Sequence, residues 1–123
     1  MPPSRTERRS SDRYALTEKN RRLRVRVGHC DTYTSNVSAS GLQLVYPAMR
    51  YPALAKYIAD ALFVLQLELP DRSVIKARGR AVYTYECGDE YLVGVEFRGF
   101  SEEGARSWER YLQRLQQACA EPA

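Results

Sequence analysis

The chain has 123 residues, of which 44% are hydrophobic, and its formal charge is +4 at neutral pH. These values predict one globular domain with its own core and argue against a disordered chain. No apolar run is long enough to cross a bilayer and the N-terminus lacks a signal-peptide core, so we expect no membrane insertion. The three cysteines, Cys30, Cys87 and Cys119, are odd in number and widely spaced, which favours reduced thiols in a cytoplasmic protein.

Positive charge is concentrated at the start of the chain. Residues 1–26 hold nine Lys and Arg against three Asp and Glu, whereas the rest of the chain holds ten against twelve. Residues 1–13 carry charge and almost no apolar surface, so we expect a flexible basic arm there. The arm would precede a folded domain at 14–118 and a short tail at 119–123. Such a basic segment is either a solvated tail or an anion-binding arm.

Alternation of apolar and polar residues predicts that most of the domain is β-structure. Arg22–Val27 alternates arginine with leucine or valine, which is typical of a half-buried strand. The apolar run that opens Leu62–Leu69 predicts a strand that is nearly buried on both faces at its start. Strands at this spacing, with little room for crossover helices, favour an antiparallel barrel or sandwich. Further strands are expected at 31–35, 42–46, 74–85 (bent at Gly79) and 91–97.

Two other stretches are not expected to be strands. The prolines within 47–60 interrupt regular structure, although Ala53–Ile58 is compatible with a helical turn. Near the end of the chain, Ser101 is followed by two glutamates, which predicts the first turn of a helix. This helix has an apolar stripe that we expect to pack across one barrel opening: Ala105, Trp108, Leu112 and Leu115.

Two short motifs combine residues suited to an anionic purine ligand. Arg9 and Arg13 lie four residues apart in the basic arm, and the planar guanidinium fork suits phosphate oxygens and the O6/N7 edge of guanine. Asn36, Ser38 and Gly41 form the second motif, in an expected turn between two strands. Amide and hydroxyl groups can meet the polar edge of a base, and glycine permits a positive φ.

Taken in order, Arg-x-x-x-Arg and Asn-x-Ser-x-x-Gly resemble the paired motifs of the PilZ domain, a family of bacterial receptors for cyclic di-GMP. The segments Gly79–Tyr83 and Gly94–Phe97 are similar to strands of the same family, and the resemblance extends from about Glu7 to about Leu115. It implies a mainly β fold, a small antiparallel β-barrel of about six strands with a C-terminal α-helix packed against it.

The resemblance also implies the residues that bind the ligand. The arginines would engage guanine edges and phosphates, with Arg8 adding a phosphate contact. The asparagine and the serine would hydrogen-bond the opposite edge of a guanine, and the glycine would keep the turn low beneath the base. Tyr83 would stack on a base or be a structural cross-strand tyrosine. The implied set is Arg8, Arg9, Arg13, Asn36, Ser38, Gly41 and Tyr83.

The expected function is that of a cyclic di-GMP receptor rather than an enzyme. The sequence has a single histidine, no Cys-x-x-Cys and no glycine-rich phosphate loop, and the family binds its ligand without turning it over. No metal or other cofactor is expected. Binding would order the arm and create a surface that a downstream protein partner reads. The resemblance implies a place in bacterial signalling, such as the control of motility or biofilm formation.

Two other functions remain open. A pI of about 9.1 and nine tyrosines also suit a small-barrel nucleic-acid binder. The tyrosines are scattered through strands and turns rather than gathered on one sheet face, which makes nucleic acid the less favoured partner. The other alternative is a PilZ-like adaptor that does not bind nucleotide and works through protein contacts alone. The intact arginine pair counts against it.

Overall fold

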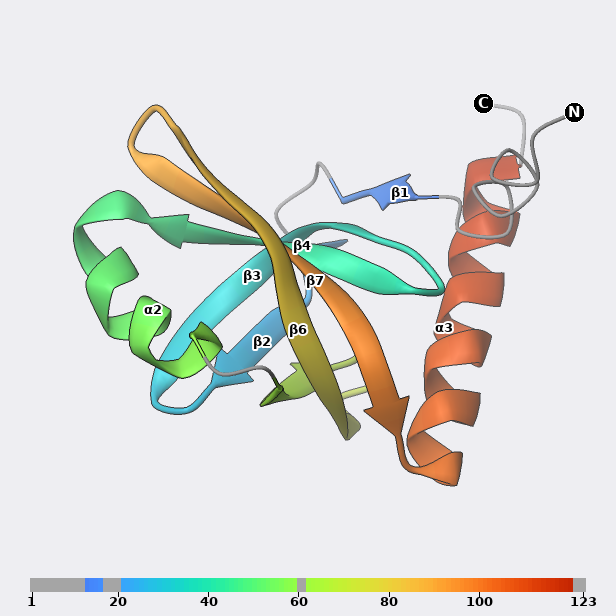
Figure 1. Cartoon of the computed structure of the whole chain (residues 1–123). Coiled ribbons are helices and arrows are strands. Elements are labelled where there is room, and N and C mark those ends of the chain that lie inside the picture. The colour runs from blue at the N-terminus through green and yellow to red at the C-terminus, as the bar shows by residue number, and fades with distance from the viewer. Residues whose placement is uncertain (1–12, 17–20, 60–61, 121–123) are drawn as a thin grey trace, which may run out of the picture.

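The computed structural model describes residues 13–16, 21–59 and 62–120 (Figure 1). Most of these residues are in strands that follow one another through short turns. The elements in chain order are β1 (Tyr14–Ala15), β2 (Arg24–Val27), β3 (Cys30–Val37), β4 (Gly41–Pro47), the 3₁₀ turn η2 (Ala48–Arg50), α2 (Tyr51–Ile58), β5 (Phe63–Glu68), β6 (Val74–Cys87), β7 (Glu90–Phe100) and α3 (Glu102–Ala120).

The strands form a closed antiparallel barrel. Six of them pair in the order β2-β5-β6-β7-β4-β3, and the pairing of β3 with β2 closes the ring. The short β1 pairs with β3 beyond the end of β2. The prediction of a small six-stranded barrel followed by a helix is therefore confirmed. Hairpins β2–β3 and β6–β7 turn at Gly28 and Gly88, which have positive φ values of 60° and 62°.

Side chains alternate between the barrel interior and solvent. In β2, Val25 and Val27 are buried while Arg24 and Arg26 are exposed, as the alternating sequence predicts. We predicted that the strand at Leu62–Leu69 would be nearly buried on both faces at its start. This prediction was wrong, since Leu62 and Val64 are 48% and 50% exposed. The reason is that β5 has the barrel core on one face and solvent on the other, so only Phe63 and alternate residues after it are buried.

The proline-rich stretch after β4 contains more helix than expected. Pro52 lies in the first turn of α2, where a missing backbone N–H costs no helical hydrogen bond. Leu54 and Ile58 pack into the core, and the ring of Tyr51 stacks on Tyr91 of β7 at a centroid distance of 4.0 Å. Figure 1 shows α2 and α3 on opposite sides of the barrel.

Helix α3 begins where predicted. The Ser101 hydroxyl accepts a hydrogen bond from the Gly104 amide at 3.0 Å, which caps the first turn. Trp108, Tyr111 and Leu115 are buried in the core, whereas Ala105 is exposed. The buried face of α3 thus includes Tyr111, whereas Leu112 of the predicted stripe is only partly buried. Trp108 packs edge-on against Phe97 of β7 at 5.2 Å between ring centroids.

Two buried tyrosines predict how stability changes at high pH. Burial raises the pKa of both Tyr46 and Tyr111 to about 12, above the ordinary value of 10.0. The unfolded chain therefore loses these protons first, so their contribution to stability is present below pH 10 and is lost as the pH rises toward 12. Urea unfolding measured across this range should show falling stability. The decline should be shallower in Tyr111→Phe, and an equal decline would contradict the assignment.

Candidate ligand-binding site

One row of cross-strand neighbours brings the predicted site together. Ala15 of β1 lies opposite Asn36 of β3, and Asn36 lies opposite Gln43 of β4. The row continues through Gly94 of β7 to Tyr83 of β6. Their neighbours along the strands, such as Val37, Leu42 and Val93, are fully buried, so the row faces outward. Residues as far apart in the chain as Ala15 and Gly94 thus share one face of the barrel.

A chain of hydrogen bonds runs along this row. Arg13 Nη1 donates to Asn36 Oδ1 at 2.8 Å, and Asn36 Nδ2 donates to Gln43 Oε1 at 3.2 Å. Gln43 Nε2 in turn donates to the Tyr83 hydroxyl at 2.6 Å. Ser35 supports the middle of the chain by donating to Gln43 Oε1 at 2.7 Å. These bonds fix the amides of Asn36 and Gln43 in one orientation.

Gly94 allows Tyr83 to reach across the sheet. A Cβ at position 94 would lie 2.0 Å from the Tyr83 ring, so the ring occupies the space where any other side chain would begin. The hydroxyl of Tyr83 can therefore reach Gln43, two strands away. The ring also stacks on Tyr85 at 5.7 Å and is 36% exposed. An exposed aromatic face beside fixed amides is suited to contact with a flat heterocycle.

Ser38 shapes the turn rather than facing solvent. Its side chain is fully buried, and its hydroxyl accepts from the Gly41 amide at 3.1 Å while lying 3.2 Å from the Gly41 carbonyl. The indole Nε1 of Trp108 donates to the Ser38 carbonyl at 3.1 Å. Helix α3 therefore holds the turn between β3 and β4 from beneath. In this conformation Ser38 offers no free polar atom to a ligand.

Gly41 is required for close packing and not for a left-handed backbone. Its φ is not positive, in contrast to the expected use of glycine in this turn. A Cβ at this position would lie 2.1 Å from the Val95 carbonyl oxygen of β7. Glycine thus lets β4 approach β7 at the start of their pairing, where Gly41 lies opposite Glu96. The motif residues Ser38 and Gly41 therefore fix the turn between β4 and β3, the strand that carries Asn36.

The arm is only partly within the described residues. Arg8 and Arg9 lie outside them. Arg13, which we expected to be unattached, is joined to the barrel through Asn36 and is followed by β1.

Sequence reasoning missed Gln43. Apart from Tyr46, it is the one polar residue in the strand segment Leu42–Tyr46. That isolated polar position on an outward face was the available signal.

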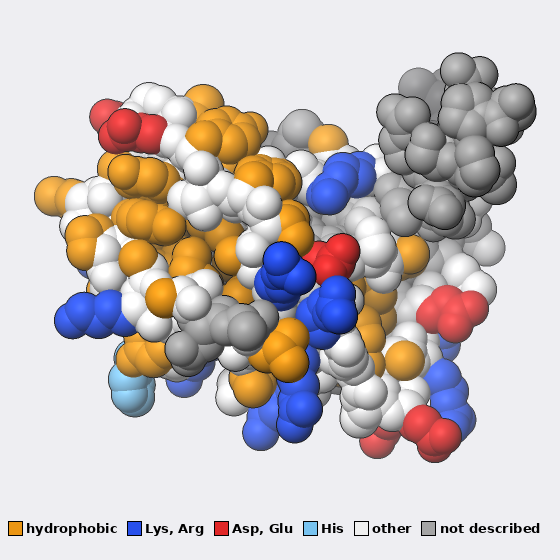
Figure 2. All heavy atoms as spheres, in the orientation of Figure 1, with side chains coloured by type: hydrophobic (Ala, Val, Ile, Leu, Met, Phe, Trp, Pro, Cys, Tyr) orange, Lys and Arg blue, Asp and Glu red, His pale blue; other side chains and the backbone are white. Residues whose placement is uncertain are grey.

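Charged side chains continue the site along β6 and β7. Arg80 lies opposite Glu96, and Arg98 forms an ion pair with Glu96 at 2.9 Å. Figure 2 shows basic side chains gathered on this front face beside a broad hydrophobic area.

Within the described residues, no group of three or more His, Cys, Asp or Glu could hold a metal ion. Neither of the described α-helices, α2 and α3, is long and apolar enough to cross a membrane.

The fold matches solved structures at low sequence identity. The Bacillus subtilis inhibitor of motility, MotI/DgrA, has a TM-score of 0.70 at 15% identity, covering 98% of this chain and 59% of that one. The Borreliella burgdorferi PlzA protein in complex with cyclic di-GMP has a TM-score of 0.57 at 20% identity, with the same coverages of 98% and 59%. An uncharacterized Legionella protein has a TM-score of 0.60 at 12% identity, covering 89% of this chain and 99% of that one.

This chain thus spans less than two thirds of two of the three structures that it matches. No curated protein sequence matches it closely. The PilZ domain family matches residues 7–114, a range that includes both motifs, the whole barrel and most of α3. Sequence and fold agree, and the chain belongs to the PilZ domain family.

Proposed function

We propose that this domain is a receptor that binds cyclic di-GMP on the outward row formed by Asn36, Gln43, Gly94 and Tyr83. The observation that carries the proposal is the hydrogen bond between Arg13 and Asn36, because it joins the two sequence motifs at one place on the barrel. The complex of PlzA with cyclic di-GMP, on a similar fold, supports the choice of ligand.

Each part of the row has a distinct role in the proposal. Among the residues that the structure describes, Asn36 accepts from one of the five guanidinium N–H donors of Arg13, and the others would serve guanine O6/N7 or a phosphate. Arg8 and Arg9 would supply further phosphate contacts. Asn36 and Gln43 would address the polar edge of a guanine, and the Tyr83 ring would stack on it. Ser38 and Gly41 would act by holding the turn.

The signal would leave through a protein partner and not through a reaction. Binding would fix the arm against the barrel rim and so form a surface of arm, ligand and barrel. The domain would act in the cytoplasm, which accords with the free thiols of Cys30 and Cys87. Regulation of motility is the process that the likeness to MotI/DgrA favours.

Calorimetric titration tests the choice of ligand. The intact protein should bind cyclic di-GMP more tightly than cyclic di-AMP, GTP or GMP. Adenine presents an amino group where guanine presents O6, so a bidentate arginine contact is lost and with it about 1–3 kcal/mol per base. Equal affinity for the two cyclic dinucleotides, or no heat with either, would refute the proposal. Tight binding of a random RNA oligomer would instead support a nucleic-acid binder.

Gly94→Ala should weaken ligand binding by displacing Tyr83. The added methyl group occupies the position of the ring, so the ring must swing away and lose its hydrogen bond to Gln43. We expect about a tenfold loss of affinity, the equivalent of one contact. Tyr83→Ala should cause a similar loss, and Gly94→Ala should add nothing further in that background. Additive losses in the double variant would show that Gly94 acts in another way.

A further inference from the structure

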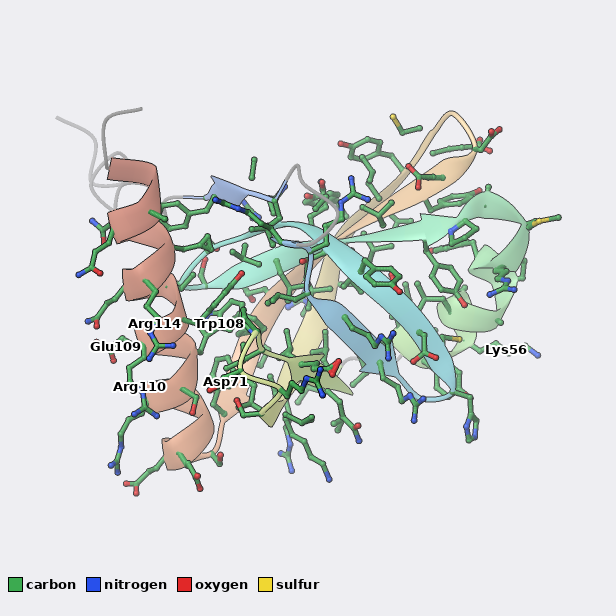
Figure 3. The ribbon with its side chains drawn as sticks, turned by 180° about the vertical axis from the view of Figure 1, so that it is seen from behind. Lys56, Asp71, Trp108, Glu109, Arg110 and Arg114 are labelled. Carbon is green, nitrogen blue, oxygen red and sulfur yellow. The ribbon has the colours of Figure 1, made fainter. Side chains whose placement is uncertain are left out.

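Two arginine-rich segments that are far apart in the sequence meet on another face of the molecule. Arg21 and Arg22 lie just before β2 and Arg24 is its first residue, whereas Arg110 and Arg114 lie on α3. The turn between β5 and β6, residues 69–73, lies at the same place, since Asp71 lines one hollow together with Arg21 and Arg110. Figure 3 shows Asp71 of this turn beside α3, near Arg110 and Arg114. The proposed ligand row uses none of these residues.

The first of two adjoining hollows lies between α3 and this turn. It has a volume of about 450 Å³, and its apolar lining includes Leu16, Leu69, Tyr111 and Leu115. Arg110 and Arg114 lie at its rim, with Asp71 opposite. The lining extends along α3 from Ser107 to Ala118, a length of about 16 Å at 1.5 Å per residue. The hollow is therefore an apolar groove about three helical turns long.

The second hollow extends the positive charge onto the barrel wall. It has a volume of about 290 Å³ and is lined by Arg22, Arg24 and Arg72 together with Tyr33. The two hollows share Arg21, Leu69 and Pro70. Together they are lined by six arginines and two acidic residues, Glu68 and Asp71. Arg72 has a positive φ of 71°, an uncommon backbone conformation for a side chain of this size.

We propose that this groove docks an acidic amphipathic helix of a partner protein. The apolar lining suits leucine or phenylalanine anchors at helical spacing, and the arginine rim suits the carboxylates that flank them. A flat membrane cannot reach the bottom of a groove. Single-stranded nucleic acids are typically bound by several exposed aromatic rings along a basic track, whereas Tyr33 is the one exposed aromatic residue in the lining of the two hollows and Tyr111 is buried.

Fluorescence anisotropy with a model peptide tests this docking surface on the full chain. The probe is a fluorescein-labelled helix of about four turns, with leucines at i, i+3, i+4 and i+7 and glutamates elsewhere. It should bind, and binding should weaken with added salt because the contacts are partly electrostatic. A matched peptide with glutamine in place of glutamate should bind at least about tenfold more weakly. Equal binding of the two peptides, or no binding, overturns the proposal.

Variants on α3 locate the binding face. Arg110→Glu combined with Arg114→Glu should reduce peptide affinity by about tenfold or more. Arg106→Glu is the control, since Arg106 is exposed on the same helix but lines neither hollow. Equal loss in the control, or preference of the protein for an oligothymidylate or for phosphatidylglycerol vesicles over the peptide, overturns the proposal. The assay contains no cyclic di-GMP, so its result is independent of the proposed ligand binding.

Discussion

Gly41→Ala is expected to lower the free energy of unfolding by about 3 kcal/mol, at the upper end of what overpacking costs. The added Cβ would lie 2.1 Å from the Val95 carbonyl oxygen, and a backbone atom in a paired strand cannot move aside as a flexible side chain can. The pairing of β4 with β7 would have to separate where Gly41 lies opposite Glu96. A domain of this size should show a fall in melting temperature of about 10 °C.

Gly99→Ala is the matched control for this change. Gly99 also lies in a strand, but a Cβ added there meets no atom within 4 Å, and its φ is not positive. Its melting temperature should change by no more than about 2 °C, as for other surface substitutions. If thermal unfolding showed equal effects for the two alanine variants, the close approach of β4 to β7 would not be the reason for glycine at position 41.

Arg13→Ala and Asn36→Ala are each expected to reduce affinity for cyclic di-GMP by ten- to a hundredfold, about 1–3 kcal/mol. The Arg13→Ala variant lacks the guanidinium donors that would bind the ligand. Asn36 loses its contact with the base and also the acceptor that positions Arg13 at 2.8 Å. Calorimetry on the two variants measures both losses. The double variant should lose less than the sum, since the two side chains act as one unit.

Stability separates a binding role from a structural one. Arg13 is exposed and its hydrogen bond to Asn36 lies at the surface, so Arg13→Ala should change the melting temperature by no more than about 2 °C. Arg106→Ala, an exposed arginine on α3, should leave both affinity and stability unchanged. A sharp drop in the melting temperature of Arg13→Ala would mean that this arginine holds the fold together.

Local patterns predicted most of the fold because each strand of this barrel has one buried face. Arg24 and Val25 point in opposite directions along β2, and the same period of two is visible in the sequence. The start of β5 was predicted wrongly because the four adjacent apolar residues Leu62–Leu65 hide the period of two. Leu62 and Val64 are apolar and yet exposed, which composition alone does not reveal.

The site was less predictable because it depends on strand register. Asn36 was identified from its motif, but its neighbour Gln43 lies on another strand, and only the pairing of β3 with β4 brings them together. The contribution of Gly94 depends likewise on Tyr83 lying opposite it. The hydroxyl of Ser38 could equally have faced a ligand or its own turn, and only the fold places it against Gly41.

Nuclear magnetic resonance of the backbone amides during titration with cyclic di-GMP locates the ligand directly. Amide shifts should change along one face, at residues 13–15, 35–43 and around Tyr83 and Gly94, with little change at residues 69–73 and 110–118. Shifts concentrated in the groove beside α3, or none anywhere at saturating ligand, would contradict the assignment of the outward row as the cyclic di-GMP site.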